Sequence, residues 1–379
     1  MNYPFSAIEC QINANIVFMN ERDYCLGFSV ANGIGPIKFN LLLSEFKTAE
    51  KAWNAKEKDL KKVLGVALTA KFFEFKSNFS LKLYAQELKK RKVSFLTTKD
   101  KEYPKLLSQI SNPPFVLYIK GNIDFNLCNP FGIVGTRKIT NYGREVTEIF
   151  SSELSSAGYT IVSGLALGVD AAAHKSAIDS KGKTIAVLGC GVDCVTPAEN
   201  ESLYNSIVGG YGAVVSEYPL GHPPTLGSFP SRNRIIAGLS LGVLVTEGAE
   251  DSGSLITAEY ALKFKRPVFA VPGPITSSLS KGPYSLIQKG AKLVTSSQDI
   301  ISELGIKNKE LRIKDKKFIV QSSDKDENLI LKLLENEPLH FDEIVRKTNL
   351  NSSKLGSILS LMEVKGIIKN VGGGEYLVN

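Results

Sequence analysis

The sequence predicts an α/β protein whose core is a doubly wound parallel sheet, with a small helical domain before it and a winged helix after it. The middle of the chain alternates short β-branched runs with segments of helical length, which is the pattern of such a sheet. Each run is nearly continuous in hydrophobicity, as expected for strands that are covered on both faces. The end of the chain instead carries amphipathic stretches and a glycine turn.

Length and composition set the expected domain organisation. At 379 residues the chain is too long for one compact core. We expect a helical domain at 1–84, the sheet-containing core at 85–306, a polar linker at 307–325 and the winged helix at 326–379. The hydrophobic content of 43% and the charged content of 22% are those of ordinary soluble proteins.

Sequence features favour a cytoplasmic location. No stretch approaches the ~20 apolar residues that span a bilayer, and the N-terminus carries no basic-then-apolar signal segment, so we expect no membrane insertion. The five cysteines are odd in number and scattered, and only three histidines accompany them. We therefore expect neither a disulfide framework nor a metal site, which fits a reducing compartment. The cysteines are Cys10, Cys25, Cys128, Cys190 and Cys194.

The charge favours a polyanionic partner. The formal net charge is +8 and the pI is near 9.0. Residues 45–105 hold 16 Lys and Arg against 8 Asp and Glu, a surplus equal to that of the whole chain. Two interpretations fit this surplus: solvated, lysine-rich helix faces, or a surface that lies near nucleic acid.

Residues 1–84 read as short helices with two glycine turns. Gly33-Ile-Gly-Pro36, followed by the apolar Leu41-Leu-Leu43, is typical of the tight turn in a helix-hairpin-helix or SAM-like domain. Leu64-Gly-Val66 fits a degenerate second copy, because it lacks the second glycine. Glycines in such turns let backbone amides approach a phosphate. The pair is either a purely structural hairpin or a working DNA contact.

Candidate strands and the helices between them define the core. Helical segments are expected at 142–157, 168–180 and 254–264. In such sheets ligands bind beyond the carboxyl ends of the strands, so the loops there form the candidate site. The candidate strands are Gly132–Val134, Thr160–Val162, Thr184–Leu188, Ala213–Val215, Gly242–Val245 and Pro267–Val271.

Amphipathic stretches followed by a hairpin predict a winged helix-turn-helix at the end of the chain. The stretches are Leu329–Leu334, Phe341–Val345 and Ser352–Lys365. The hairpin joins Ile367–Val371 to Glu375–Val378 through Gly372-Gly-Gly374.

Glycine-containing loops follow several of the candidate strands. Gly135-Thr-Arg137 follows the first strand, and its arginine can clamp an oxyanion. Ser163–Asp170 follows the second strand, Gly189–Asp193 the third, and Glu247–Thr257 the fifth. One such loop is weak evidence, because tight strand-to-helix turns need glycine anyway. Several together, joined by arginines, predict a cradle for a polyanion.

The segment Phe229-Pro-Ser-Arg-Asn-Arg234 adds a second kind of chemistry. It opens an apolar helix, where free backbone N–H groups and the helix dipole favour an anion. Arginine donates bidentately to phosphate, and phenylalanine offers a face on which a base can stack. Arg232 and Arg234 would lie roughly 200° apart on a helix, so both cannot face one ligand equally. Which of them is held in an internal ion pair stays open.

Enzyme interpretations mostly fail on the residues. Gly189-Cys-Gly191 lacks the third glycine of a dinucleotide fingerprint, and Gly182-Lys-Thr184 precedes its strand instead of following it, as a Walker A loop would. No G-x-S-x-G elbow and no carboxylate cluster with metal-ligand spacing occurs. Asp170 and His174 stand at helical i, i+4 spacing, which favours a hydrogen bond that organises the loop over acid–base catalysis.

Ordered segments of the core carry a family resemblance. They are Ile133–Arg137, Ser163–His174, Phe229–Gly238, Ser252–Ala258 and Phe269–Gly273. With the lead-in residues Tyr103-Pro104 and Pro113–Tyr118, they closely resemble the DprA/Smf DNA-processing family. The resemblance spans about residues 100–300 and implies a Rossmann-like core. The flanking helical and winged-helix segments also suit full-length members of that family.

The resemblance implies a protein that binds single-stranded DNA, loads the RecA recombinase onto it and acts in natural transformation. It also implies a homodimer, no cofactor and no established catalytic reaction. By motif, Arg137, Phe229 and the Arg232/Arg234 pair would form the DNA pocket, with Ser163, Gly164, Gly253 and Ser254 shaping its floor. The full set of implied DNA-binding residues is Gly135, Arg137, Ser163, Gly164, Phe229, Arg232, Asn233, Arg234, Gly253 and Ser254.

The sequence departs from the family pattern at two places. Val195-Thr-Pro197 stands where family members usually have Tyr-Pro, so an aromatic ring is lost. Between Pro219 and Phe229 there is no lysine or arginine, although a basic residue often helps the pocket there, and His222 is the only substitute. These departures imply either a weaker pocket or DNA that leans on the N-terminal lysines.

Two other functions are weighed beside DNA binding. Glu247 and Gly253–Glu259 vaguely resemble the signature of nucleotide phosphoribohydrolases in the lysine-decarboxylase-like group, but the paired glycines before it are absent. A sequence-specific transcription regulator would use the winged helix. Residues 326–379 hold six Lys and Arg against eight Asp and Glu, and DNA readers of this type usually carry more positive charge.

Overall fold

The computed structural model describes residues 19–305, 325–334, 338–365 and 367–378. Two compact units divide the chain between Asn308 and Lys309. The linker expected at 307–325 lies outside the described residues except for Lys325, and so does Cys10. The other cysteines are free thiols. Within the described ranges, no helix combines the length and the apolar character that crossing a bilayer requires.

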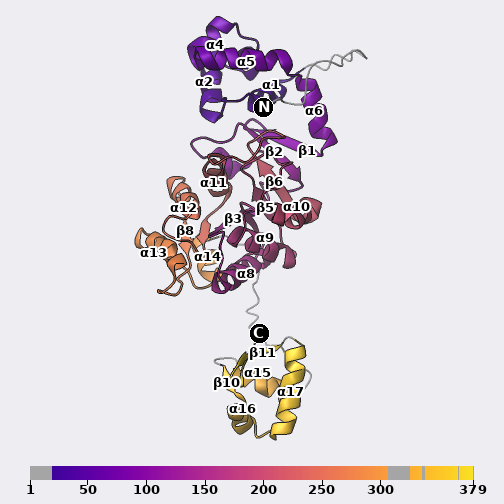
Figure 1. The fold of residues 1–379 in the computed structure, drawn as a ribbon, viewed down its shortest axis with the longest axis vertical. Coiled ribbons are helices and arrows are strands. Elements are labelled where there is room, and N and C mark those ends of the chain that lie inside the picture. The colour runs from indigo at the N-terminus through magenta and orange to yellow at the C-terminus, as the bar shows by residue number, and fades with distance from the viewer. Residues whose placement is uncertain (1–18, 306–324, 335–337, 366, 379) are drawn as a thin grey trace. The chain divides into compact units, whose positions relative to one another are not determined.

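The first described residues form a bundle of short helices (Figure 1). Their bounds are α1 (Glu21–Val30), α2 (Pro36–Phe46), α3 (Ala49–Trp53), α4 (Glu57–Leu64), α5 (Val66–Asn78) and α6 (Leu81–Lys90). Both predicted glycine turns form: Gly33 (φ +87°) lies between α1 and α2, and Gly65 (φ +77°) lies between α4 and α5. The domain boundary expected after residue 84 falls inside α6.

Aromatic side chains hold the bundle together and join it to the core. The Phe28 and Phe72 rings stack at 5.2 Å, and Trp53 meets both edge-on. Phe39 of α2 stacks at 3.9 Å on Phe115, which precedes a strand of the core. The bundle and that end of the sheet therefore share one hydrophobic cluster.

The core contains a nine-stranded sheet with the order β1-β2-β6-β5-β4-β3-β7-β8-β9. The bounds are β1 (Val93–Thr97), β2 (Val116–Gly121), β3 (Asn129–Val134), β4 (Tyr159–Ser163), β5 (Thr184–Val187), β6 (Gly212–Ser216), β7 (Val243–Val245), β8 (Val268–Ala270) and β9 (Lys292–Leu293). All of the predicted strands form, and they pair in parallel. β1 and β2 add an antiparallel edge, which the sequence analysis did not predict.

Helices cover both faces of this sheet (Figure 1). One face carries α8 (Asn141–Ser156), α9 (Val169–Asp179) and α14 (Ser297–Leu304). The other carries α7 (Lys105–Ser108), α11 (Ser228–Leu239), α12 (Gly253–Lys263) and α13 (Lys281–Gln288). Successive strand residues serve opposite faces: Ile133 packs with the first group and Val134 with the second. The doubly wound, Rossmann-like architecture is confirmed.

Shorter elements complete this unit. α10 (Glu201–Ser206) packs at the end of the sheet near the helical bundle, where Tyr204 joins the shared cluster. Single turns of 3₁₀ or π helix occur at Ala198–Asn200, Ile207–Tyr211 and Ser278–Ser280.

The second unit is a winged helix with a hydrophobic core of its own. It contains α15 (Lys325–Leu334), β10 (Leu339–His340), α16 (Phe341–Thr348), α17 (Ser352–Val364), β11 (Ile368–Gly372) and β12 (Glu375–Val378). The strands pair antiparallel in the order β10-β12-β11. The predicted helices and hairpin are confirmed.

Candidate nucleic-acid interface

A cavity of about 450 Å³ lies at the carboxyl ends of the central strands. The loop after β3, the loop after β4 and the first turns of α11 and α12 form its walls. The structure thus gathers segments that lie more than a hundred residues apart in the chain, at the edge where parallel sheets bind ligands. The predicted residues that line it are Gly135, Arg137, Asp170, Phe229, Arg232, Asn233, Gly253 and Ser254.

Arg137 and Phe229 form a cation–π pair in the cavity. The guanidinium carbon of Arg137 lies 5.3 Å from the centroid of the Phe229 ring. Arg137 is exposed, and in the described part of the chain it makes no ion pair with a carboxylate. Phe229 is partly buried. The pair therefore offers a cation for an incoming anion and an aromatic face beside it.

The N-terminus of α12 forms the adjacent wall. Ser252 caps this helix, and its hydroxyl lies 2.8 Å from that of Ser254. Gly253 has open space where a Cβ would be, so ligand atoms can approach its backbone. Asn233 donates a hydrogen bond of 3.0 Å to the carbonyl of Gly253 and so ties α11 to α12. Hydroxyl groups and a helix N-terminus together suit an anion.

Arg232 is a buried clamp beneath the cavity. Its Nη1 donates to the carbonyls of Gly164 and Val187, both at 2.5 Å, and so joins the ends of β4 and β5. Nearby, the Asp170 carboxylate accepts from the amides of Gly164 (3.1 Å) and Ala166 (3.4 Å). Burial raises the pKa of Asp170, and the charge of Arg232 partly offsets that rise. Burial likewise lowers the pKa of Arg232.

Arg234, expected in the DNA pocket, lies elsewhere. It pairs with Glu217 and donates a 2.8 Å hydrogen bond to the carbonyl of Asn112, and neither charged side chain is more than 12% exposed. Because Arg234 lies two residues after Arg232 on α11, it turns to another side of that helix. The question left open by the sequence is settled for Arg234, which is locked in an internal ion pair.

Ser163 and Gly164 lie behind the cavity rather than on its floor. The Ser163 hydroxyl is fully buried and donates to the carbonyl of Ile133 at 2.6 Å. A Cβ on Gly164 would stand 2.1 Å from Nη1 of Arg232. These two residues are not part of the cavity lining but support it from behind, and their part in DNA binding stays a prediction.

The hydrogen bond expected between Asp170 and His174 does not form. Nδ1 of His174 instead meets the hydroxyl of Thr184 at 2.6 Å, and its Nε2 is buried without a partner. The Asp170 carboxylate accepts hydrogen bonds from the amides of Gly164 and Ala166 instead. Burial lowers the pKa of His174 to about 3, so the ring is neutral and anchors α9 to the sheet. Asp170 alone bonds to the loop.

Leu226 is a rim residue that the sequence did not single out. Its side chain is 94% exposed and lines the cavity mouth three residues before Phe229. Only part of the signal for Leu226 was in the sequence, which showed that no lysine or arginine stands between Pro219 and Phe229. An exposed leucine at the mouth of the cavity adds apolar surface there and no charge.

The structure weakens the alternatives. Glu247 is buried and accepts hydrogen bonds from the amide and hydroxyl of Thr140, so it does not line the cavity as a hydrolase carboxylate would. Among the described residues, no group of three or more His, Cys, Asp or Glu is placed to hold a metal ion. In the winged helix, Lys354 at the start of α17 is paired with Asp326 at 2.6 Å.

Comparison with known proteins decides the family. Residues 94–305 match the family model described as DNA recombination-mediator protein A, and residues 316–374 match that of the DprA winged helix domain. The chain belongs to the DprA/Smf family. It is 34% identical to Protein Smf of Synechocystis sp. over 94% of this chain and 98% of the relative. It is 47% identical to DprA of Streptococcus pneumoniae over 53% of this chain and 71% of the relative.

Solved structures of DprA share the fold. The structure of Streptococcus pneumoniae DprA matches with a TM-score of 0.66 and 38% identity, covering 76% of this chain and 98% of that one. DprA of Helicobacter pylori, whose structure is described as showing a unique single-stranded DNA binding mode, matches with a TM-score of 0.51 and 32% identity. That match covers 56% of this chain and 95% of the other.

Proposed function

We propose that the cavity at the carboxyl edge of the sheet binds single-stranded DNA. The observation that carries the proposal is the exposed Arg137 guanidinium over the Phe229 ring, beside the N-terminus of α12. Arg137 and the first turn of α12 bind phosphate, while the ring stacks with a base. The description of the Helicobacter pylori relative supports the same ligand.

The geometry favours a single strand over a duplex. A base can stack on Phe229 only if one of its faces is free, and in a duplex both faces are covered by neighbouring pairs. The cavity of about 450 Å³ falls within the range of small-ligand sites, so it can hold a group the size of one nucleotide. Phosphate contacts and stacking read no base edges, and binding is therefore tolerant of sequence.

The roles of the predicted residues divide into contact and support. Gly253 lets the DNA strand approach the protein backbone, Gly135 and Ser254 line the cavity beside it, and Asn233 holds α11 against α12. Arg232, Asp170, Ser163 and Gly164 support the cavity, because their hydrogen bonds hold the ends of the β-strands beneath it in place. Arg234 takes no part in the contact.

The wider role follows from the family. We infer that the bound strand is passed to the RecA recombinase, that the protein works as a homodimer in the cytoplasm, and that the process served is natural transformation. The match to the family of recombination mediators supports this role. We also infer that the site uses no cofactor and catalyses no reaction, and in support Asp170, the carboxylate in the lining of the cavity, accepts hydrogen bonds from the amides of Gly164 and Ala166.

The test compares variants that differ only at the cavity. Arg137→Ala and Phe229→Ala should each weaken binding of a fluorescent single-stranded oligonucleotide by about 5- to 150-fold, the factor that ~1–3 kcal/mol corresponds to. Lys175→Ala removes an exposed cation on α9 that does not line the cavity, so it serves as the matched control. If all three variants bind like the wild type, the site lies elsewhere.

A further inference from the structure

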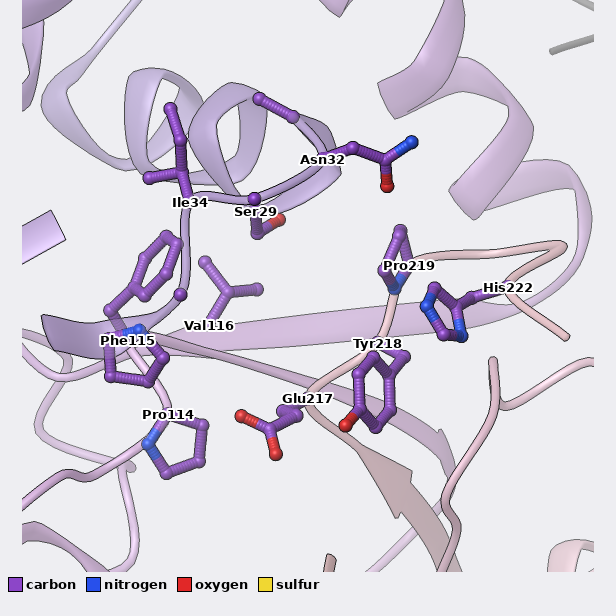
Figure 2. A pocket seen from close by; sticks show the side chains of 14 residues that line it. Ser29, Asn32, Ile34, Pro114, Phe115, Val116, Glu217, Tyr218, Pro219 and His222 are labelled. Carbon is purple, nitrogen blue, oxygen red and sulfur yellow. The ribbon is translucent and has the colours of Figure 1, made fainter. Parts of the chain in front are cut away.

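A second cavity, of about 160 Å³, lies between the helical bundle and the core (Figure 2). One wall is the turn between α1 and α2, with Gly33 and Gly35. The opposite wall is the loop after β6, with Glu217, Tyr218 and His222. None of the residues that line it lines the first cavity. Pockets at such boundaries are frequent ligand sites.

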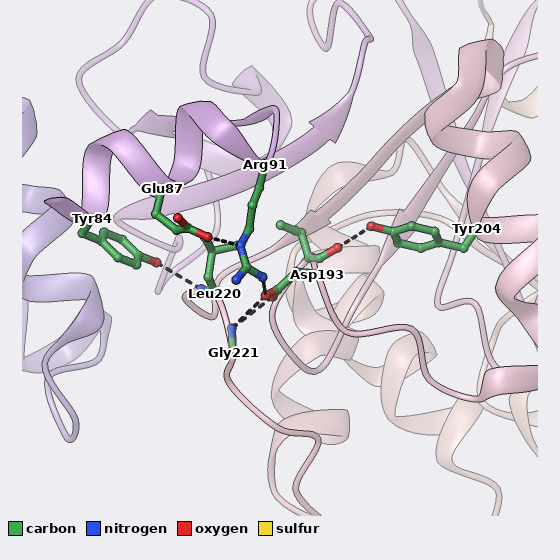
Figure 3. Close-up of polar contacts among 8 residues, drawn as sticks. Tyr84, Glu87, Arg91, Asp193, Tyr204, Leu220 and Gly221 are labelled. Atoms are coloured by element: carbon green, nitrogen blue, oxygen red, sulfur yellow. Dashed lines mark hydrogen bonds and ion pairs between the residues drawn. The ribbon is translucent and has the colours of Figure 1, made fainter. Parts of the chain in front are cut away.

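The loop on the core side is held by contacts from α6, from Arg91 at its end and from Asp193 after β5 (Figure 3). The amide of Leu220 donates to the Tyr84 hydroxyl at 3.0 Å. The amide of Gly221 donates to the Asp193 carboxylate at 3.0 and 3.2 Å, and Arg91 pairs with the same carboxylate at 2.8 Å. The cavity wall is therefore a fixed surface that exists before any ligand arrives.

Tyr218 and His222 give this cavity an aromatic platform. Their rings are stacked with centroids 4.4 Å apart and planes inclined by 23°. Both side chains are only partly buried and both line the cavity, as Figure 2 shows. A further flat ring can extend this stack, which is how proteins hold the bases of single strands.

The polar groups of the two walls favour different parts of a nucleotide. Glu217 is paired with Arg234 through one carboxylate oxygen, and its carboxylate has the capacity to accept a further hydrogen bond from the exocyclic amino group of a base. On the opposite wall, Gly35 has open space where a Cβ would be, and α2 starts there without a side-chain cap. That backbone suits a phosphate. A base thus fits beside Glu217, and its phosphate beside the turn.

The two cavities lie along one continuous segment of chain. Residues 217–222 contribute to the second cavity, and residues 226–233 contribute to the first. His222 and Leu226 are four residues apart, a distance of at most about 14 Å along the chain. A strand that leaves the first cavity along this segment reaches the second within a few nucleotides.

We propose that this second cavity is an additional subsite for the same DNA strand, in which a base stacks on Tyr218 and His222 while its phosphate meets the α1–α2 turn. The inference rests on the proposed function, because it places a further nucleotide of the strand held by Arg137 and Phe229. It also gives the glycine turn of the helical domain a role in ligand binding. Bases that carry an exocyclic amino group are preferred, since Glu217 accepts from them.

The experiment measures affinity against oligonucleotide length. A short strand of about 2 nucleotides, which cannot reach both cavities, and a long strand of about 16 nucleotides, at the upper end of common site sizes, are titrated against the full-length protein. Tyr218→Leu and His222→Ala should leave binding of the short strand unchanged. For the long strand, each should lose about 5- to 150-fold in affinity. Tyr218→Phe keeps the ring and should bind both lengths like the wild type.

The outcomes separate this inference from the proposed function. Arg137→Ala, titrated in parallel, weakens both lengths if the first cavity binds DNA, whatever happens at Tyr218. If Arg137→Ala weakens binding but Tyr218→Leu and His222→Ala bind the long strand like the wild type, the second subsite is refuted alone. A loss equal for both lengths, or shared by Tyr218→Phe, also refutes it, because that pattern reports a disturbed fold. A crystal structure with a protein segment in this cavity and DNA elsewhere has the same consequence.

Discussion

Replacing Arg232 by methionine tests whether this arginine supports the site or contacts the ligand. Methionine keeps much of the side-chain length but removes the guanidinium. The carbonyls of Gly164 and Val187 then lose their donor, and the buried Asp170 carboxylate loses its neighbouring positive charge. The result should be a less stable protein rather than a folded protein with weak affinity.

The structure sets the size of the effect. Asp170 is 6% exposed and Arg232 is 5% exposed, so water cannot replace the lost contacts. The substitution leaves two buried carbonyls without their donor and removes a positive charge near the buried Asp170, for which we expect a cost of about 3–5 kcal/mol. At about 2–4 °C per kcal/mol, the value for domains of 150–250 residues, the melting temperature should fall by roughly 6–20 °C.

Calorimetry of the full-length protein measures this shift. The matched control is Arg137→Ala, which removes an exposed arginine from the same cavity and should melt with the wild type. DNA affinity is measured well below both transitions. An Arg232→Met protein that keeps the melting temperature of the wild type but binds DNA weakly would contradict the clamp and make Arg232 a ligand contact.

Two further predictions concern residues near the same clamp. Gly164→Ala should lower the free energy of unfolding by about 1–3 kcal/mol, because the added Cβ would displace Arg232. Gly253→Ala is the control and should melt like the wild type, because there is open space where its Cβ would be. If the two variants melt at the same temperature, the close packing of Gly164 against Arg232 is refuted. The His174 ring should stay neutral in NMR titrations of the folded protein down to about pH 4. Between about pH 6.5 and 3 the unfolded state therefore binds more protons than the folded state. As the pH is lowered through that window, the free energy of unfolding should fall by up to ~1.4 kcal/mol per pH unit. Protonation near pH 6 in the folded protein would contradict this burial.

The central strands were predictable because their hydrophobicity is local and continuous. A strand that is covered on both faces is a continuous hydrophobic run, which can be recognised in the sequence without knowing which strands lie beside it. The antiparallel edge was not predicted, because Val93–Thr97 is partly exposed and so lacks a continuous hydrophobic run. In the sheet this strand pairs with Val116–Gly121. The two-residue strand Lys292–Leu293 is exposed and too short to leave a pattern.

The arginines show where sequence reasoning stops. Helical spacing predicted that Arg232 and Arg234 face different ways, but it could not say which way. That depends on partners far away in the chain: two carbonyl groups for Arg232, and Glu217 for Arg234. The same limit applies to His174. In the folded sheet its ring contacts the hydroxyl of Thr184, and Asp170 accepts from the amide of Gly164, so the expected bond between them does not form. Arg137 and Phe229 do lie in one cavity, as their loop positions predicted.

The central claim is that the carboxyl edge of the sheet is a cradle for the backbone and bases of a single DNA strand. The most direct measurement is a gel shift of the full-length protein with matched single- and double-stranded oligonucleotides across a salt series. Single strands should bind more tightly at every salt concentration, and log affinity should fall linearly with log salt, by about 0.7 per phosphate contact. Equal affinity for both forms, or affinity that does not change with salt, would contradict the account.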